Sequence, residues 1–145
     1  ANSLMLCGAL LGVNITVASP QGFEPSDEIL HQARSIAINE TKIEVTNNPL
    51  EAASGANALY TDVWASMGQE KEQGLRAKSF QGFCLDRTFL EVADPNAIVL
   101  HCLPAHRGEE ISEEVMESSA SRIFEQAENR LHVQQALLAS LLGGL

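Results

Sequence analysis

Two short polar clusters in this sequence contain the side chains best suited to chemistry. The first polar cluster, 62–68, reads Asp-Val-Trp-Ala-Ser-Met-Gly, and the second, 101–108, reads His-Cys-Leu-Pro-Ala-His-Arg-Gly. Asp62 offers a carboxylate that can bind a cationic substrate group, whereas an Asp in a turn commonly caps that turn. Cys102, beside His101, can act as nucleophile or base if its pKa is lowered, and the alternative is a buried structural cysteine. Taken singly, neither cluster decides between chemistry and structure.

Nearby basic and imidazole side chains favour an anion site over a metal site. Arg107 and Arg130 are candidates for binding carboxylate or phosphate, because a guanidinium group pairs well with both anions. For Arg130 the alternative is an ordinary surface salt bridge. A metal shared by His101, His106 and Cys102 lacks any further ligand cluster, so we predict no metal and no cofactor. The sequence also contains no GxGxxG or GxxxxGK[ST] phosphate loop.

The elements that must position these clusters follow from the apolar pattern. Short β-branched or apolar runs alternate with helical patterns, which predicts a doubly wound α/β fold with a parallel sheet. The predicted strands are 14–18, 42–46, 58–64 and 97–102, the predicted helices are 3–12, 26–39, 49–54, 86–93 and 123–142, and 65–85 is predicted to be a long functional loop. Because ligands bind beyond the carboxyl ends of parallel strands, we expect both clusters on one rim.

Length and charge limit the classes of function. The chain has 145 residues, which suits one domain over 1–145, and its apolar fraction of 45% is typical of a globular protein. With 9 Lys and Arg against 19 Asp and Glu, the net charge of −10 argues against a nucleic-acid partner or an anionic membrane surface. Three scattered cysteines (Cys7, Cys84, Cys102) predict reduced thiols and a cytoplasmic protein.

Three motifs in order resemble one enzyme family. The first polar cluster, the His-Cys-Leu-Pro start of the second, and Glu-Asn-Arg at 128–130 closely resemble the second half of ornithine carbamoyltransferases. The resemblance extends over essentially the whole chain. Ser-Met-Gly after an Asp-Val-Trp strand end points to ornithine rather than aspartate as the amine substrate.

The resemblance implies a role for individual residues. Asp62 would orient L-ornithine, and Ser66 and Met67 would contact its amino-acid end. Cys102 would be the catalytic residue beside the δ-amine, helping it to lose a proton. Cys102 and Leu103 would contact carbamoyl phosphate through their backbone, Arg130 would bind the same substrate, and the role of His101 would be positional.

The resemblance also implies what lies outside this chain. The Ser-Thr-Arg-Thr and His-Pro-x-Gln motifs of the carbamoyl-phosphate half do not occur here. In the family, a strand and a Gly-Asp-Gly-Asn-Asn turn precede the helix that begins this chain. We therefore expect a sheet whose first, central strand is missing, and an isolated chain that is inactive. We also expect the apolar residues of the last helix to be partly exposed. The full-length enzyme would be a homotrimer in arginine biosynthesis.

Two other functions remain open from the sequence. The chain could be a binding module that keeps the fold and binds an amino acid without turnover. It could also belong to a transcarbamoylase for another amine, such as putrescine or acetylornithine. The Ser-Met-Gly segment together with Asp62 makes ornithine the better choice of substrate.

Overall fold

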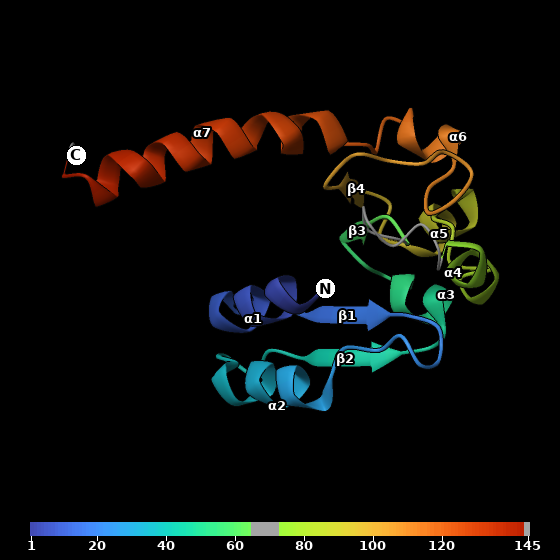
Figure 1. Ribbon diagram of the computed structural model, residues 1–145, viewed down its shortest axis with the longest axis horizontal. Coiled ribbons are helices and arrows are strands. Elements are labelled where there is room, and N and C mark those ends of the chain that lie inside the picture. Colours follow the sequence, from blue (N-terminus) through green and yellow to red (C-terminus); the bar gives the residue numbers. More distant parts are fainter. Residues whose placement is uncertain (65–72, 144–145) are drawn as a thin grey trace. The chain divides into compact units, whose positions relative to one another are not determined.

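A computed structural model describes residues 1–64 and 73–143 of the chain (Figure 1). The chain divides into two compact units, Ala1–Ala52 and Ala53–Leu145. Each unit contains helices and one pair of parallel strands. The α/β class and the parallel pairing predicted from the sequence are therefore confirmed.

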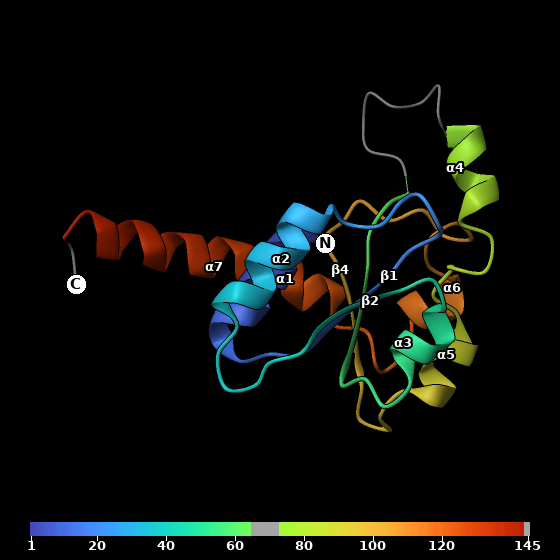
Figure 2. The same cartoon turned by 90° about the horizontal axis from the view of Figure 1, so that it is seen from below.

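The first unit packs two helices against a strand pair. Its elements are α1 (Asn2–Leu11), β1 (Ile15–Ala18), α2 (Asp27–Ile36), β2 (Ile43–Thr46) and most of α3 (Pro49–Ala53). The helices α1 and α2 lie side by side (Figure 2), and their small core contains Met5, Ala9, Ala33 and Ile43. Gly12 ends α1 with a φ of 75°, the left-handed conformation in which glycine has no Cβ penalty.

The second unit carries both polar clusters. Its elements are β3 (Ala58–Thr61), α4 (Gln73–Ser79), α5 (Arg87–Val92), β4 (Ile98–His101), α6 (Glu113–Met116) and α7 (Ile123–Leu141). Strand β3 pairs with β4 so that Ala58 lies opposite Ile98 and Thr61 opposite His101. The core beneath them includes Val99, Ile111, Val115 and Ile123, all fully buried. Packing on this core holds β3 and β4 in place, and with them the residues that follow each strand.

The predicted elements differ from the observed ones mainly between 62 and 85. Strand β3 ends at Thr61, so Asp62 already lies beyond the sheet, and α4 occupies part of the predicted loop 65–85. The loop prediction is therefore wrong for Gln73–Ser79. Helix α4 has no strong apolar stripe of its own, but the segment just after it packs, with Phe80 stacked on Trp64 at 5.6 Å and in edge contact with Phe83 at 5.8 Å. The contact between Trp64 and Phe80 joins residues that are distant in sequence.

The four strands form two separate sheets. Among the described residues, β1 pairs only with β2 and β3 only with β4. Each of the two pairs is parallel, as the sequence predicts.

Helix α7 is long and largely exposed. Only Ile123 is buried, whereas five leucines are between 56% and 84% exposed: Leu131, Leu137, Leu138, Leu141 and Leu142. The expected exposure of its apolar residues is confirmed. No helix in the described part of the chain combines the length and apolarity that crossing a membrane requires.

Candidate functional site

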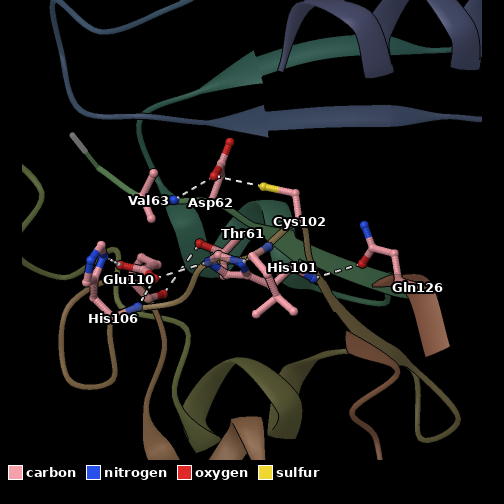
Figure 3. A network of polar contacts seen from close by, with 9 residues as sticks. Thr61, Asp62, Val63, His101, Cys102, His106, Glu110 and Gln126 are labelled. Atoms are coloured by element: carbon pink, nitrogen blue, oxygen red, sulfur yellow. Dashed lines mark hydrogen bonds and ion pairs between the residues drawn. The ribbon is translucent and has the colours of Figure 1, made fainter. Parts of the chain in front are cut away.

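The ends of β3 and β4 bring the two polar clusters together. Because Thr61 and His101 are paired, the next residues, Asp62 and Cys102, leave the sheet side by side. The Cys102 thiol donates a hydrogen bond to Asp62 Oδ1 at 3.0 Å, and the Val63 N–H donates to the same oxygen at 2.8 Å (Figure 3). The prediction that both clusters share one rim is confirmed for these two residues.

The surroundings of Cys102 keep its thiol protonated. Burial raises the pKa of Cys102, and the hydrogen bond to Asp62 and the negative charge of that carboxylate act in the same direction. Burial also raises the pKa of Tyr60, whose hydroxyl accepts a hydrogen bond from Gln126 at 3.2 Å. The interpretation of Cys102 as a thiol with a lowered pKa is therefore wrong, because His101 does not point its ring at the sulfur but at Leu103 and Glu110. In this structure Cys102 is a neutral hydrogen-bond donor.

The raised pKa predicts slow alkylation of Cys102. Only the thiolate reacts with iodoacetamide, so at pH 8 we expect Cys102 to react about threefold or more slowly than the exposed Cys7. The rate should rise as the pH rises through the elevated pKa. The matched variant Asp62→Asn removes the negative charge and should raise the alkylation rate of Cys102 without changing that of Cys7. Peptide mass spectrometry measures the alkylation rates of Cys102 and Cys7. If Cys102 reacted at the same rate in the wild type and in Asp62→Asn, the environment assigned to Cys102 would be contradicted.

A pocket of about 870 Å³ opens beside these residues in the second unit. Cys102, Leu103 and Arg130 all line it, so the structure brings together the three residues for which the family resemblance implies contact with carbamoyl phosphate. Arg130 is exposed and forms no ion pair with any described residue. Arg107 also lines the pocket, but it pairs with Glu117 at 2.5 Å. Of the two predicted anion-binding arginines, Arg130 is thus the one whose guanidinium is not already paired with a carboxylate among the described residues.

A buried polar network, which the sequence analysis missed, supports the second cluster from below. His101 and Glu110 are both fully buried, and His101 Nε2 lies 3.1 Å from Glu110 Oε1 (Figure 3). The other ring nitrogen, Nδ1, accepts a hydrogen bond from the Leu103 N–H at 2.8 Å. The His101 N–H donates to Gln126 Oε1 at 3.0 Å, which ties strand β4 to α7. The positional role expected for His101 is consistent with these contacts.

Sequence signals for these missed residues differ. Gln126 lies four residues before Arg130, so both share one face of the predicted helix and the spacing could have singled it out. Nothing in the sequence distinguishes Glu110 from its neighbour Glu109. Ligand atoms of His106, Glu109 and Glu110 lie within 4.8 Å of one another, but Glu110 Oε1 already accepts two hydrogen bonds. This group differs from the His101, His106 and Cys102 set that the sequence analysis considered and rejected as a metal site.

The remaining predicted site residues cannot be placed. Ser66 and Met67, assigned to the amino-acid end of the substrate, lie outside the described residues. The described part of the candidate site therefore consists of Asp62, Cys102, Leu103 and Arg130.

Comparison with protein families identifies one match that covers nearly the whole chain. Residues 1–141 match the family described as aspartate/ornithine carbamoyltransferase, Asp/Orn binding domain. The chain is 68% identical over 145 residues to an ornithine carbamoyltransferase of Prochlorococcus marinus (strain MIT 9313), covering 100% of this chain and 46% of that protein. It thus spans about half the length of the curated relatives that it matches.

Solved structures agree with this match. The ornithine carbamoyltransferase from Pyrococcus furiosus superposes with a TM-score of 0.92 at 43% identity, over 100% of this chain and 47% of that one. The anabolic ornithine carbamoyltransferase from Campylobacter jejuni gives a TM-score of 0.92 at 42% identity, over 99% of this chain and 48% of that one. Both comparisons place the likeness in one half of a longer protein.

Proposed function

The chain belongs to the aspartate/ornithine carbamoyltransferase family, as its Asp/Orn binding domain, and from this premise we propose that it is the ornithine-binding half of an ornithine carbamoyltransferase. The complete enzyme would transfer the carbamoyl group of carbamoyl phosphate to the δ-amine of L-ornithine, giving citrulline and phosphate. The observation that carries the proposal is the pairing of Cys102 with Asp62 at 3.0 Å, beside a pocket lined by Arg130. Through Cys102, a carboxylate that can bind a cationic amine adjoins a pocket that is lined by a guanidinium able to bind an anion.

The amine must lose a proton before it attacks the carbonyl carbon. An alkyl amine has an ordinary pKa of about 10.4, so it is charged at neutral pH and attracted to the Asp62 carboxylate. A neutral Cys102 thiol can accept a proton from the amine only as its own proton passes to Asp62, to which it is already hydrogen-bonded. We propose this relay for Cys102, with the lone pair of the amine then forming the new C–N bond as the C–O bond to phosphate breaks. The second proton of the attacking nitrogen passes to the departing phosphate.

The backbone at Leu103 suggests how carbamoyl phosphate is held. The Leu103 N–H is used by His101 Nδ1, so the expected backbone contact from Leu103 belongs to its carbonyl group. A carbonyl oxygen accepts hydrogen bonds and therefore suits the NH₂ group of the carbamoyl moiety. Arg130 would then bind the phosphate and stabilise the negative charge that the leaving group gains.

The finer points of fold and assembly belong to the same proposal. We infer that the two strand pairs are parts of one doubly wound sheet, with a further strand supplied by the rest of the enzyme. This is supported by the TM-score of 0.92 with a complete carbamoyltransferase chain. A homotrimer in the cytoplasm, without nucleic-acid or membrane partners, completes the proposal. A crystal structure of the full-length protein tests the sheet and the trimer, and cell fractionation tests the location.

Citrulline formation tests the function directly. We expect no turnover from the isolated chain, because its sequence lacks the phosphate-binding motifs of the family. Adding the carbamoyl-phosphate-binding half of the Prochlorococcus relative in trans should restore carbamoylation of L-ornithine, which gives citrulline, but not of putrescine or acetylornithine. Colorimetric detection of citrulline and of each other carbamoylated amine measures this. Turnover by the chain alone would contradict the division of labour between the halves.

Calorimetry separates the enzyme from a pure binding module. A module would bind L-ornithine with the same affinity with or without the other half and carbamoyl phosphate. An enzyme half should bind it more tightly once carbamoyl phosphate and the other half are present. Ornithine affinity that is independent of both, with no turnover, would favour the module.

A further inference from the structure

We propose that Glu110 is a positioning residue of this site: its buried carboxylate orients the His101 ring, which in turn holds the backbone turn at Leu103 that lines the pocket. The inference rests on the proposed function for its kinetic consequences, but its structural content stands on hydrogen bonds within the second unit. Neither the family resemblance nor the comparisons assign a role to Glu110.

The hydrogen bonds of His101 define the state of its ring. Leu103 N–H, 2.8 Å from Nδ1, can only donate, so Nδ1 must carry a lone pair. Nε2 lies 3.1 Å from Glu110 Oε1, a carboxylate oxygen that can only accept, so Nε2 must carry the proton. His101 is therefore a neutral ring protonated at Nε2. In histidines generally, the hydrogen bond that one ring nitrogen makes determines whether the other nitrogen carries the proton.

The turn that His101 holds is not one that leucine adopts readily. Leu103 has a φ of 57°, in the left-handed region that is unfavourable for a residue with a branched side chain. Such a conformation persists only where the surroundings restrain it. The hydrogen bond from Leu103 N–H to the buried His101 ring is such a restraint, and it fixes where the carbonyl groups of Cys102 and Leu103 lie.

Glu110 is built firmly into the same unit. Its side chain is fully buried, and Oε1 also accepts the His106 N–H at 2.5 Å. Its own carbonyl accepts hydrogen bonds from Leu85 N–H at 2.9 Å and from the hydroxyl of Thr61, at the end of β3, at 3.4 Å. Burial acts to raise the pKa of Glu110, but the hydrogen bonds from His101 and His106 outweigh it and hold that pKa below the ordinary value. The residue therefore stays a carboxylate, which only accepts hydrogen bonds.

The second carboxylate oxygen of Glu110, Oε2, makes it possible to test the hydrogen bonds of this side chain separately from its negative charge. Oε2 is buried and forms no hydrogen bond with the described residues, and its closest basic atom is His106 Nδ1 at 3.7 Å. In Glu110→Gln, the amide oxygen can keep both bonds of Oε1 while the NH₂ group takes the place of Oε2. Glutamine should therefore preserve the orientation of His101, whereas leucine, of similar size, should not.

The test uses the complete enzyme that carries this chain, with Glu110→Leu, Glu110→Gln and the neighbouring Glu109→Gln as matched control. Nitrogen-15 NMR of the histidine rings should show His101 protonated at Nε2 in the wild type, in Glu110→Gln and in Glu109→Gln. In Glu110→Leu we expect a mixture of tautomers. We expect kcat/KM for carbamoyl phosphate to fall about 10- to 100-fold in Glu110→Leu, by analogy with the loss when the carboxylate that orients a metal-binding histidine is removed. Glu110→Gln should remain within about fivefold of wild type.

Two results would overturn the proposal. One is a folded Glu110→Leu variant in which His101 keeps a single Nε2 proton. The other, which stays informative if Glu110→Leu does not fold, is Glu110→Gln with an unchanged His101 ring but a loss of more than about 10-fold in kcat/KM. Failure of the proposed function would look different: the wild type would form no citrulline, while the NMR signature of His101 and its loss in Glu110→Leu would remain measurable.

Discussion

Asp62→Ala in the complete enzyme is expected to lower kcat/KM for L-ornithine by about 100-fold, through both a higher KM for that substrate and a lower kcat. The carboxylate lies immediately beyond β3, is exposed, and already accepts hydrogen bonds from Val63 and Cys102. Its removal takes away both the charge that attracts the amine and the acceptor that the Cys102 thiol uses. The KM for carbamoyl phosphate should change little. Steady-state kinetics with each substrate varied in turn measures the two effects separately.

Two further variants make the Asp62 result specific. Asp62→Asn keeps the size and can still accept the Val63 N–H, so it should lose ornithine use because the negative charge that attracts the amine and accepts the Cys102 proton is gone. Asp94→Asn is a position control, because Asp94 Oδ1 accepts a backbone N–H at 2.8 Å just as Asp62 does but lies outside the site. It should leave both KM values unchanged. Equal rises in the KM for both substrates in Asp62→Ala would mean that Asp62 supports the fold and not the amine.

Arg130→Ala is expected to have the second large effect, and this effect is on the use of carbamoyl phosphate. We expect about a 100-fold loss in kcat/KM for carbamoyl phosphate, because a charge-assisted bond to a phosphate is lost. Arg130 lines the pocket with Cys102 and Leu103 and has no competing ion pair among the described residues. Arg130→Lys should recover part of the loss, since lysine keeps the charge but not the planar fork of donors.

Arg107→Ala is the matched control for Arg130. Arg107 lines the same pocket, but it is about half exposed and bound to Glu117 at 2.5 Å. Exposed pairs of this kind contribute little to stability, so the variant should fold normally and keep kcat/KM within about threefold. Inhibition by inorganic phosphate supplies a second measurement, and it should weaken only in the Arg130 variants. A loss in Arg107→Ala equal to that in Arg130→Ala would contradict the assignment of the anion site to Arg130.

Local sequence patterns were sufficient to predict most of the elements around these residues. The alternation of short apolar runs with capped helical segments predicted β1, β2, β4 and α7 to within a few residues. Ser26 accepts the Ile29 N–H and starts α2, and Gly12 ends α1, because both are signals carried by one residue and its neighbours. Helix α4 was missed because Gln73–Ser79 carries no regular apolar stripe that would set it apart from a polar loop.

For the candidate site, too, some features follow from the sequence and others only from the tertiary structure. The sequence by itself determined which residue types meet, since the clusters at 62–68 and 101–108 follow strands whose carboxyl ends lie on one edge of a sheet. Only the tertiary structure decided their chemical states. Burial and the Asp62 carboxylate raise the pKa of Cys102, the Glu117 carboxylate engages Arg107 but not Arg130, and Glu110, nine residues from His101, becomes the acceptor for its ring. Solvation and the identity of hydrogen-bond partners depend on which residues the fold brings together, and a linear pattern contains no such distances.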